Sequence, residues 1–245
     1  MRLSQAWIVA RHDLGLLRQR RGILFGLIAF PIGVGLGFPA LVEFLLLPHG
    51  GPNPGTWAPM FIDAFAFWFV IGAASLPTTI ASYSIVGEKV SKSLEPLLST
   101  PTTDGEILLG KALAALLPTL IAAWIGALVF QVAIDLETVG PFGYLYYPNW
   151  EMAVELFVAL PVVALMAIEA SVVISSRVTD IRSAQQYAGL IFVPMIFIYV
   201  AAEVVLTLTV VNLLYISAGF GLLTLGLFWL SLKAFHRDEI LTRWK

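Results

Sequence analysis

Residues 112–134 read ALAALLPTLIAAWIGALVFQVAI, a run without a single charged side chain. A helix needs about 20 mostly apolar residues to cross the hydrocarbon core of a bilayer. Similar runs recur on both sides of this one, and the sequence predicts about six transmembrane helices. They cover residues 23–47, 60–86, 112–134, 153–175, 187–209 and 211–235. The expected fold class is therefore an all-α polytopic membrane protein, with a single transmembrane domain over residues 1–245.

Composition and charge agree with this prediction. Apolar residues make up 59% of the chain and charged residues 12%, about half the charged fraction of soluble domains. The 14 Lys and Arg residues form four clusters, and pairs of apolar runs separate them. Because Lys and Arg near the ends of spans stay in the cytoplasm, we expect a multi-pass protein of the cell membrane with both termini cytoplasmic. Nothing here predicts binding to nucleic acid.

Residues 1–21 precede the first span and are amphipathic. An apolar stripe recurs there at helical spacing and consists of Leu3, Trp7, Ala10, Leu14 and Leu17. This pattern predicts an interfacial helix that contacts membrane lipid through its apolar face and the headgroups through its cations. The alternative is a helix that packs on the protein's own cytoplasmic loops.

Two features leave the arrangement of the spans open. Gly22/Gly26 and Gly33/Gly37 are small-xxx-small pairs in the first span, and such pairs let helices approach closely in lipid. They indicate either a subunit interface or merely the usual abundance of glycine in membrane helices. The stretch Ala201–Leu214 forms either the boundary between the last two spans or a re-entrant element.

The segment between the second and third spans, residues 87–111, reads GEKVSKSLEPLLSTPTTDGEILLGK. Gly87 is suited to ending the second span, and Leu94–Leu98 has apolar residues at the spacing of one or two helical turns. Thr103 and Glu106 form a capping-box pattern, which predicts the start of the helix that enters the third span. The residues alone favour equally a docking element for a soluble partner and an ordinary cytoplasmic loop.

This segment resembles the signature region of type-2 ABC exporter permeases. The matching positions are Glu88, Ser93–Glu95, Leu97–Leu98, Pro101, Glu106 and Leu108–Lys111, whereas many members have Gly in place of Lys92. The resemblance implies a permease subunit that forms a translocation path with a second permease, as a homodimer or a related heterodimer. It also implies that separate ABC ATPase subunits dock on a short coupling helix between spans two and three. The coupling residues that it implies are Glu88, Leu94, Glu95, Leu97 and Leu98.

The chain has no ATP-binding motif of its own. A P-loop needs Gly-x-x-x-x-Gly-Lys-Ser/Thr, and neither Lys92-Ser93 nor Gly110-Lys111 stands in that pattern. We therefore expect no enzyme activity and no cofactor on this chain, with ATP and Mg²⁺ on the partner ATPase. No metal site is expected, because there is no Cys and the three His residues lie far apart. A non-transporting membrane scaffold, an intramembrane enzyme and a secondary transporter or channel are the alternative functions.

Two carboxylates fall inside expected spans, Glu169 and Glu203. An ionised side chain at the centre of a bilayer costs about 2.5–3.5 kcal/mol on insertion scales, so each must face protein or water. Either residue could line the translocation path, or it could hydrogen-bond to a neighbouring helix through a residue such as Ser171 or Tyr199. The sequence does not specify the transported substrate.

Overall fold

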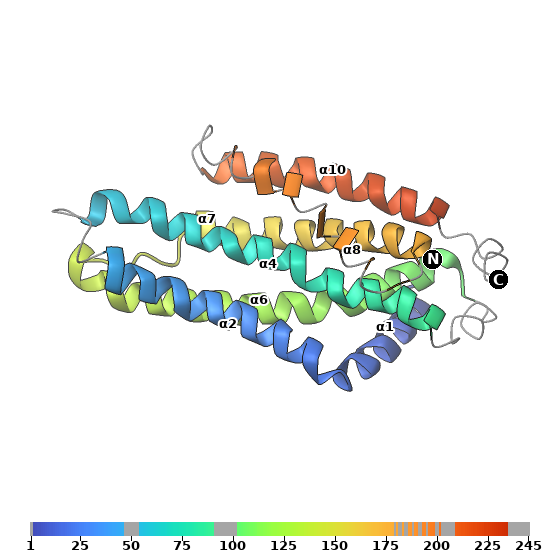
Figure 1. Cartoon of the computed structure of the whole chain (residues 1–245). Coiled ribbons are helices and arrows are strands. Elements are labelled where there is room, and N and C mark those ends of the chain that lie inside the picture. The colour runs from blue at the N-terminus through green and yellow to red at the C-terminus, as the bar shows by residue number, and fades with distance from the viewer. Residues whose placement is uncertain are drawn as a thin grey trace.

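The computed structural model describes residues 2–46, 54–90, 102–178 and 209–234, with scattered positions between 180 and 201. The described elements are helices (Figure 1). They are α1 (Leu3–Arg18), α2 (Arg21–Leu41), α4 (Pro54–Val90), α6 (Asp104–Phe142), α7 (Trp150–Val154), α8 (Leu160–Arg177) and α10 (Val210–Ala234), with π-helical turns η1 (Val42–Leu46) and η2 (Glu155–Ala159).

Five described stretches are long and apolar enough to cross a membrane. They are Arg21–Phe44, Trp57–Ser82, Asp104–Phe142, Trp150–Ser175 and Val210–Lys233. These stretches correspond to five of the six expected spans, and the prediction of a polytopic helical membrane protein is confirmed. The other expected span, residues 187–209, and much of Ala201–Leu214 lie outside the described residues.

The helices form an elongated bundle with two distinct ends (Figure 1). α2 packs on α6, α4 packs on both α6 and α8, and α10 packs on the outer side of α8. α1, the starts of α2 and α6, and the ends of α4, α8 and α10 lie at one end, which we call the basic end because most of the described Lys and Arg residues belong to these segments. The loop between α6 and α7 lies at the opposite end.

The third span extends further than the apolar run predicts. This span was expected to end at residue 134, but α6 continues as one helix to Phe142. A helix satisfies its own backbone hydrogen bonds wherever it runs, so the edge of an apolar run need not be its end. Gly143 terminates α6 instead: its φ is +78°, a left-handed conformation that favours glycine, and its N–H donates to the Val139 carbonyl at 3.0 Å.

The helix of the second expected span, α4, also differs from the prediction at both ends. α4 begins at Pro54, before the expected start at residue 60, because proline at the first helical position lacks only an N–H that a helix start leaves unpaired. At its other end α4 passes through Gly87 and ends at Val90, so the predicted stop at Gly87 is wrong. Glycine inside a helix costs about 1 kcal/mol relative to alanine, which a long helix tolerates.

Glycine does allow a close helix crossing, but at other positions than the predicted pairs. A Cβ atom on Gly35 of α2 would lie 2.6 Å from the Gly126 carbonyl oxygen of α6, and one on Gly126 would lie 2.5 Å from the Pro31 Cβ. The backbones of α2 and α6 meet here. The predicted pairs make no comparable contact within the described residues: a Cβ on any of their members meets no atom within 4 Å. Their role as a subunit interface therefore stays a prediction.

Candidate functional site

The N-terminal helix α1 lies across the start of α6 at the basic end (Figure 1). Its buried face consists of Ala6, Val9, Ala10 and Leu17. Leu3 and Trp7, which were expected on the same apolar stripe, are 73% and 50% exposed. Among the described residues α1 therefore packs mainly on the spanning helix α6 and keeps a second apolar face exposed, while the cytoplasmic loop of residues 91–101 lies outside the described residues. Membrane lipid as the partner of that outer face stays a prediction.

The predicted capping box at the start of α6 is confirmed. The Thr103 hydroxyl accepts a hydrogen bond from the Glu106 N–H at 3.4 Å, and the Glu106 Oε2 atom accepts one from the Thr103 N–H at 3.0 Å. Each side chain satisfies a backbone donor that the first turn of a helix leaves without a partner. Glu106 itself is only 1% exposed, which indicates that its side chain also contacts residues outside α6.

The second oxygen of Glu106 caps another helix. Glu106 Oε1 accepts a hydrogen bond from the Arg2 N–H at 2.7 Å, and Arg2 is the N-cap residue of α1. One carboxylate therefore serves the N-termini of both α1 and α6, where the partial positive charge of the helix dipole favours an anion. Charge-assisted hydrogen bonds of this kind are about twice as strong as neutral ones.

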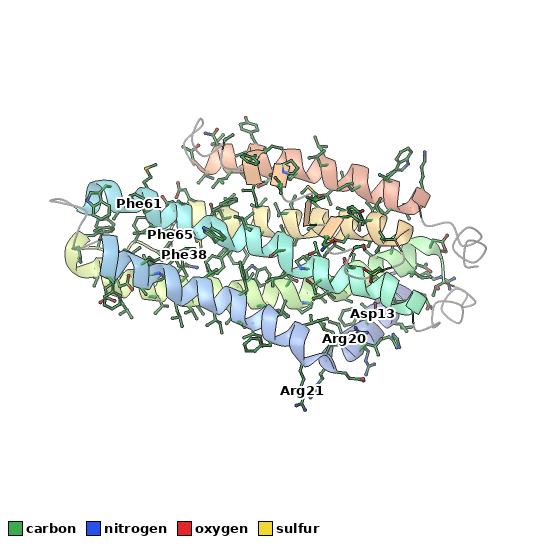
Figure 2. The ribbon with its side chains drawn as sticks, viewed as in Figure 1. Asp13, Arg20, Arg21, Phe38, Phe61 and Phe65 are labelled. Carbon is green, nitrogen blue, oxygen red and sulfur yellow. The ribbon has the colours of Figure 1, made fainter. Side chains whose placement is uncertain are left out.

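Two further residues of the same motif hold α1 against α6. A Cβ on Gly110 would lie 2.6 Å from the Ala6 carbonyl oxygen and 2.7 Å from the Val9 Cβ, so only glycine allows the α1 backbone to come this close. One residue further on, the Lys111 Nζ lies 3.3 Å from the Asp13 Oδ2, with side-chain exposures of 1% and 11%. Asp13 is labelled in Figure 2, close to the junction of α1 with α2.

We call Glu106, Gly110 and Lys111 the α1 seat. Sequence analysis identified all three from the resemblance, but assigned none of them to α1. The missed information is tertiary: the spacing of these residues places them along one side of the first turns of α6, and nothing in the local sequence states which helix covers that side. The sequence shows only a glycine next to a lysine at positions 110 and 111, and their burial follows from the fold.

Most of the predicted coupling residues are not described by the structure. Glu88 lies in the last turn of α4, but its side chain is not among those described, and Leu94, Glu95, Leu97 and Leu98 lie outside the described residues. The structure does describe the helices that precede and follow them, α4 and α6. Residues 91–101 connect the end of α4 to Thr102 and the α1 seat, so the expected coupling helix directly precedes that seat. Its contact with an ATPase stays a prediction.

Of the two carboxylates expected inside spans, Glu169 is described and Glu203 is not. Glu169 lies in α8 and is 3% exposed, and its Oε2 accepts a hydrogen bond from the Ser231 hydroxyl of α10 at 2.7 Å. The hydrogen-bonding alternative named a neighbour such as Ser171 or Tyr199. Ser171 instead donates to the Ala167 carbonyl of its own helix. Path lining by Glu169 or Glu203 stays a prediction.

We expect Glu169 to join α8 to α10, so Glu169→Gln should leave transport within about twofold of wild type. The amide retains an acceptor for the Ser231 hydroxyl, whereas Ser231→Ala removes the donor and leaves a buried carboxylate, at a cost of about 1–3 kcal/mol. Transport and thermal unfolding of both variants are the measurement. A tenfold change in transport for Glu169→Gln, with ATPase binding intact, would favour the path-lining role instead.

The bundle of apolar helices with a short helix seated on its third span defines a polytopic helical membrane protein. Among the described residues, no three His, Asp or Glu side chains could hold a metal ion together. Comparison with known families then gives the class of transporter. Residues 7–232 match the model of the ABC-2 family transporter protein, and the match extends from α1 into α10. The chain belongs to this family, and is thus a membrane permease component of an ABC transporter. No curated protein matches it closely enough to serve as a relative.

Proposed function

We propose that this chain is the permease subunit of an ATP-driven exporter. In this proposal two permease subunits form the translocation path in the cell membrane, with their termini in the cytoplasm. Separate ABC ATPase subunits bind ATP and Mg²⁺ and dock on residues 91–101. The family match and the charge distribution support the membrane role. The observation that carries the coupling role is the α1 seat, which joins two helices immediately after the expected docking segment.

The seat suggests how movement of the ATPases would reach the spans. A push on residues 91–101 acts on the N-terminus of α6, which those residues precede. Since Glu106, Gly110 and Lys111 hold α1 to that terminus, α1 follows. α1 leads through only Gln19 and Arg20 into α2, and α2 contacts α6 again at the Gly35–Gly126 crossing. In this proposal α1, α2 and α6 therefore respond as one unit.

The proposal predicts that an ABC ATPase copurifies with the tagged chain from its native membranes, and that Glu95→Arg or Leu97→Asp removes it. A reversed charge or a buried carboxylate at the centre of an interface costs about 2 kcal/mol or more, enough to reduce recovery at least about tenfold. Mass spectrometry of the copurified proteins is the measurement. Glu43→Arg is the matched control, because Glu43 is exposed and lies beyond the end of α2, away from the basic end.

Two results would contradict the proposal. If no ATPase accompanies the wild-type chain under mild conditions, the coupling role fails, and the non-transporting scaffold becomes the better hypothesis. If the ATPase is retained by both variants but lost with Glu43→Arg, docking occurs elsewhere than residues 91–101.

A further inference from the structure

α1 has an exposed face on the side turned away from the α1 seat. Its residues recur at helical spacing and line a wide groove of about 520 Å³; they are Ile8, Arg11, His12, Gly15, Leu16 and Gln19. Each of them is exposed, whereas the opposite face of α1 is buried and packs on α6. Sites for small ligands have volumes of roughly 300–1,000 Å³, so this groove has room for a bound chemical group.

The groove carries positive charge that the described residues do not balance. The first 21 residues of the chain contain five Arg and a single acidic residue, Asp13. Asp13 already has partners: its Oδ2 lies 3.3 Å from the buried Lys111 Nζ, and its Oδ1 lies 3.3 Å from the His12 Nδ1. Arg11 and Arg18 are exposed, and neither forms an ion pair among the described residues. The complement of this face is therefore an anion.

An apolar strip lies directly beside these cations. Leu3 and Trp7 are 73% and 50% exposed. Leu3, Trp7 and Arg11 are four residues apart, so they follow one another along one side of the helix. Tryptophan favours the level of the lipid headgroups in a membrane. Apolar side chains next to cations match the boundary between acyl chains and headgroups, so the anion that fits this face belongs to a lipid.

The connection of α1 to α2 places the groove near the edge of the membrane. Gln19, which lines the groove, and Arg20 are the only residues between the two helices. The apolar stretch of α2 that is long enough to span a bilayer begins with the next residue, Arg21. Figure 2 shows the Arg21 side chain pointing away from the bundle at this junction. One end of the groove therefore lies where a spanning helix begins, which is the level of phospholipid phosphates.

We propose that this groove binds the headgroup of one anionic phospholipid. The Arg11 guanidinium can donate to two phosphate oxygens at once, and the side chains of His12 and Gln19 provide further donors. Leu3 and Trp7 then contact the acyl chains of the same lipid. A zwitterionic lipid such as phosphatidylcholine fits less well, because the arginine repels its choline cation. This defined site goes beyond the general membrane contact that the amphipathic pattern predicts, and it needs no ATPase partner.

Native mass spectrometry of the purified full chain in detergent micelles tests the site. Phosphatidylglycerol and phosphatidylcholine with identical acyl chains are added at equal concentrations, and the ratio of the two lipid adducts is measured. We expect one phosphatidylglycerol per chain, retained at least about fivefold better than phosphatidylcholine, since one Arg near an anionic lipid contributes about 1 kcal/mol. Arg11→Gln should bring the ratio close to that of a chain without preference.

A second variant distinguishes a defined groove from diffuse attraction. Gly15 lines the groove, and a Cβ at this position meets no atom within 4 Å in the described structure. Gly15→Leu therefore fits the fold but fills the groove, and it should remove the preference although every charge remains. Arg2→Gln is the matched control, because Arg2 is an exposed arginine that does not line the groove. It keeps the backbone N–H that donates to Glu106, and the ratio should be that of the wild type.

Three results would overturn the proposal. A wild-type chain without preference would show that the groove does not select anionic lipid; if Arg11→Gln also lost a copurifying ATPase, this face would belong to that partner. Equal losses in Arg2→Gln and Arg11→Gln, with Gly15→Leu unaffected, would indicate diffuse attraction. Displacement of phosphatidylglycerol by an equal concentration of glycerol phosphate, which lacks acyl chains, would identify a soluble phosphate compound as the occupant. The lipid adducts are measured without an ATPase, so failure of the exporter proposal would leave this test intact.

Discussion

Gly126→Val is expected to lower the thermal midpoint of the purified chain by roughly 6–12 °C. A Cβ at this position would lie 2.5 Å from the Pro31 Cβ and 2.6 Å from the Pro31 carbonyl oxygen, and these are backbone and ring atoms that no rotamer change can move. Overpacking a core costs about 1–3 kcal/mol and occasionally more. We expect the upper part of that range, about 3 kcal/mol, which gives the stated shift for a chain of this length.

Gly33→Val is the control for this experiment, because a Cβ on Gly33 of the same helix pair meets no atom within 4 Å in the described structure. Its midpoint should stay within about 2 °C of wild type, since surface substitutions usually change stability by no more than about 0.5 kcal/mol. Thermal unfolding in one detergent is the measurement for both variants. Equal losses would show that added bulk, and not the α2–α6 crossing, is responsible. A change in oligomeric state for Gly33→Val alone would support the predicted subunit interface.

Gly35 and Gly126, where α2 crosses α6, show which parts of the fold the sequence can predict. Span number and helix identity follow from length and hydropathy, which act locally along the chain. A glycine spacing, in contrast, describes one helix surface and leaves open which neighbour, if any, meets it. Gly35 and Gly126 have no distinguishing pattern of their own, yet they form the α2–α6 crossing. The end of α6 was mispredicted for a related reason: hydropathy detects lipid contact and not the continuation of backbone hydrogen bonds.

The candidate site likewise contains one feature that the sequence predicted and others that follow only from the fold. The capping box at Thr103 and Glu106 was predictable, because its partners lie three residues apart and its physics is local. The second hydrogen bond of Glu106, to the Arg2 N–H, joins residues 104 positions apart and follows only from the fold. The exposure of Trp7 on α1 also follows only from the fold. The spacing of apolar residues predicts a helix, but Ala6 and Val9, which are small enough to approach Gly110, determine which face of that helix packs.

Glu106→Ala is expected to release α1 from the bundle. The substitution deprives two helix N-termini of their acceptor at once, the Arg2 and Thr103 N–H groups. Of these two bonds only the one from Arg2 joins α1 to α6, and loss of a hydrogen bond to a charged acceptor costs about 1.5–3 kcal/mol. Because every 1.4 kcal/mol is a factor of ten in an equilibrium, the population with α1 detached should rise at least about tenfold.

A single engineered cysteine can measure this release, since the chain contains none of its own. Ala10 is 0% exposed on the buried face of α1, so in the Ala10→Cys background maleimide labelling should be slow. Adding Glu106→Ala should accelerate it by the same factor of at least about ten. Glu43→Ala removes an exposed carboxylate beyond the end of α2, opposite the basic end, and should leave the rate unchanged. Unchanged labelling in the Glu106 variant would show that the other members of the α1 seat suffice to hold the helix.

The same variant separates attachment of the ATPase from transmission of its movement. Residues 91–101 are intact in Glu106→Ala, so the ATPase should still copurify. If α1, α2 and α6 transmit the movement as one unit, transport should nevertheless fall at least about tenfold, because α1 no longer follows the start of α6. Loss of the ATPase with unchanged cysteine labelling would contradict this mechanism and indicate that Glu106 contacts the partner directly. Full transport with a detached α1 would place the coupling route entirely within α6.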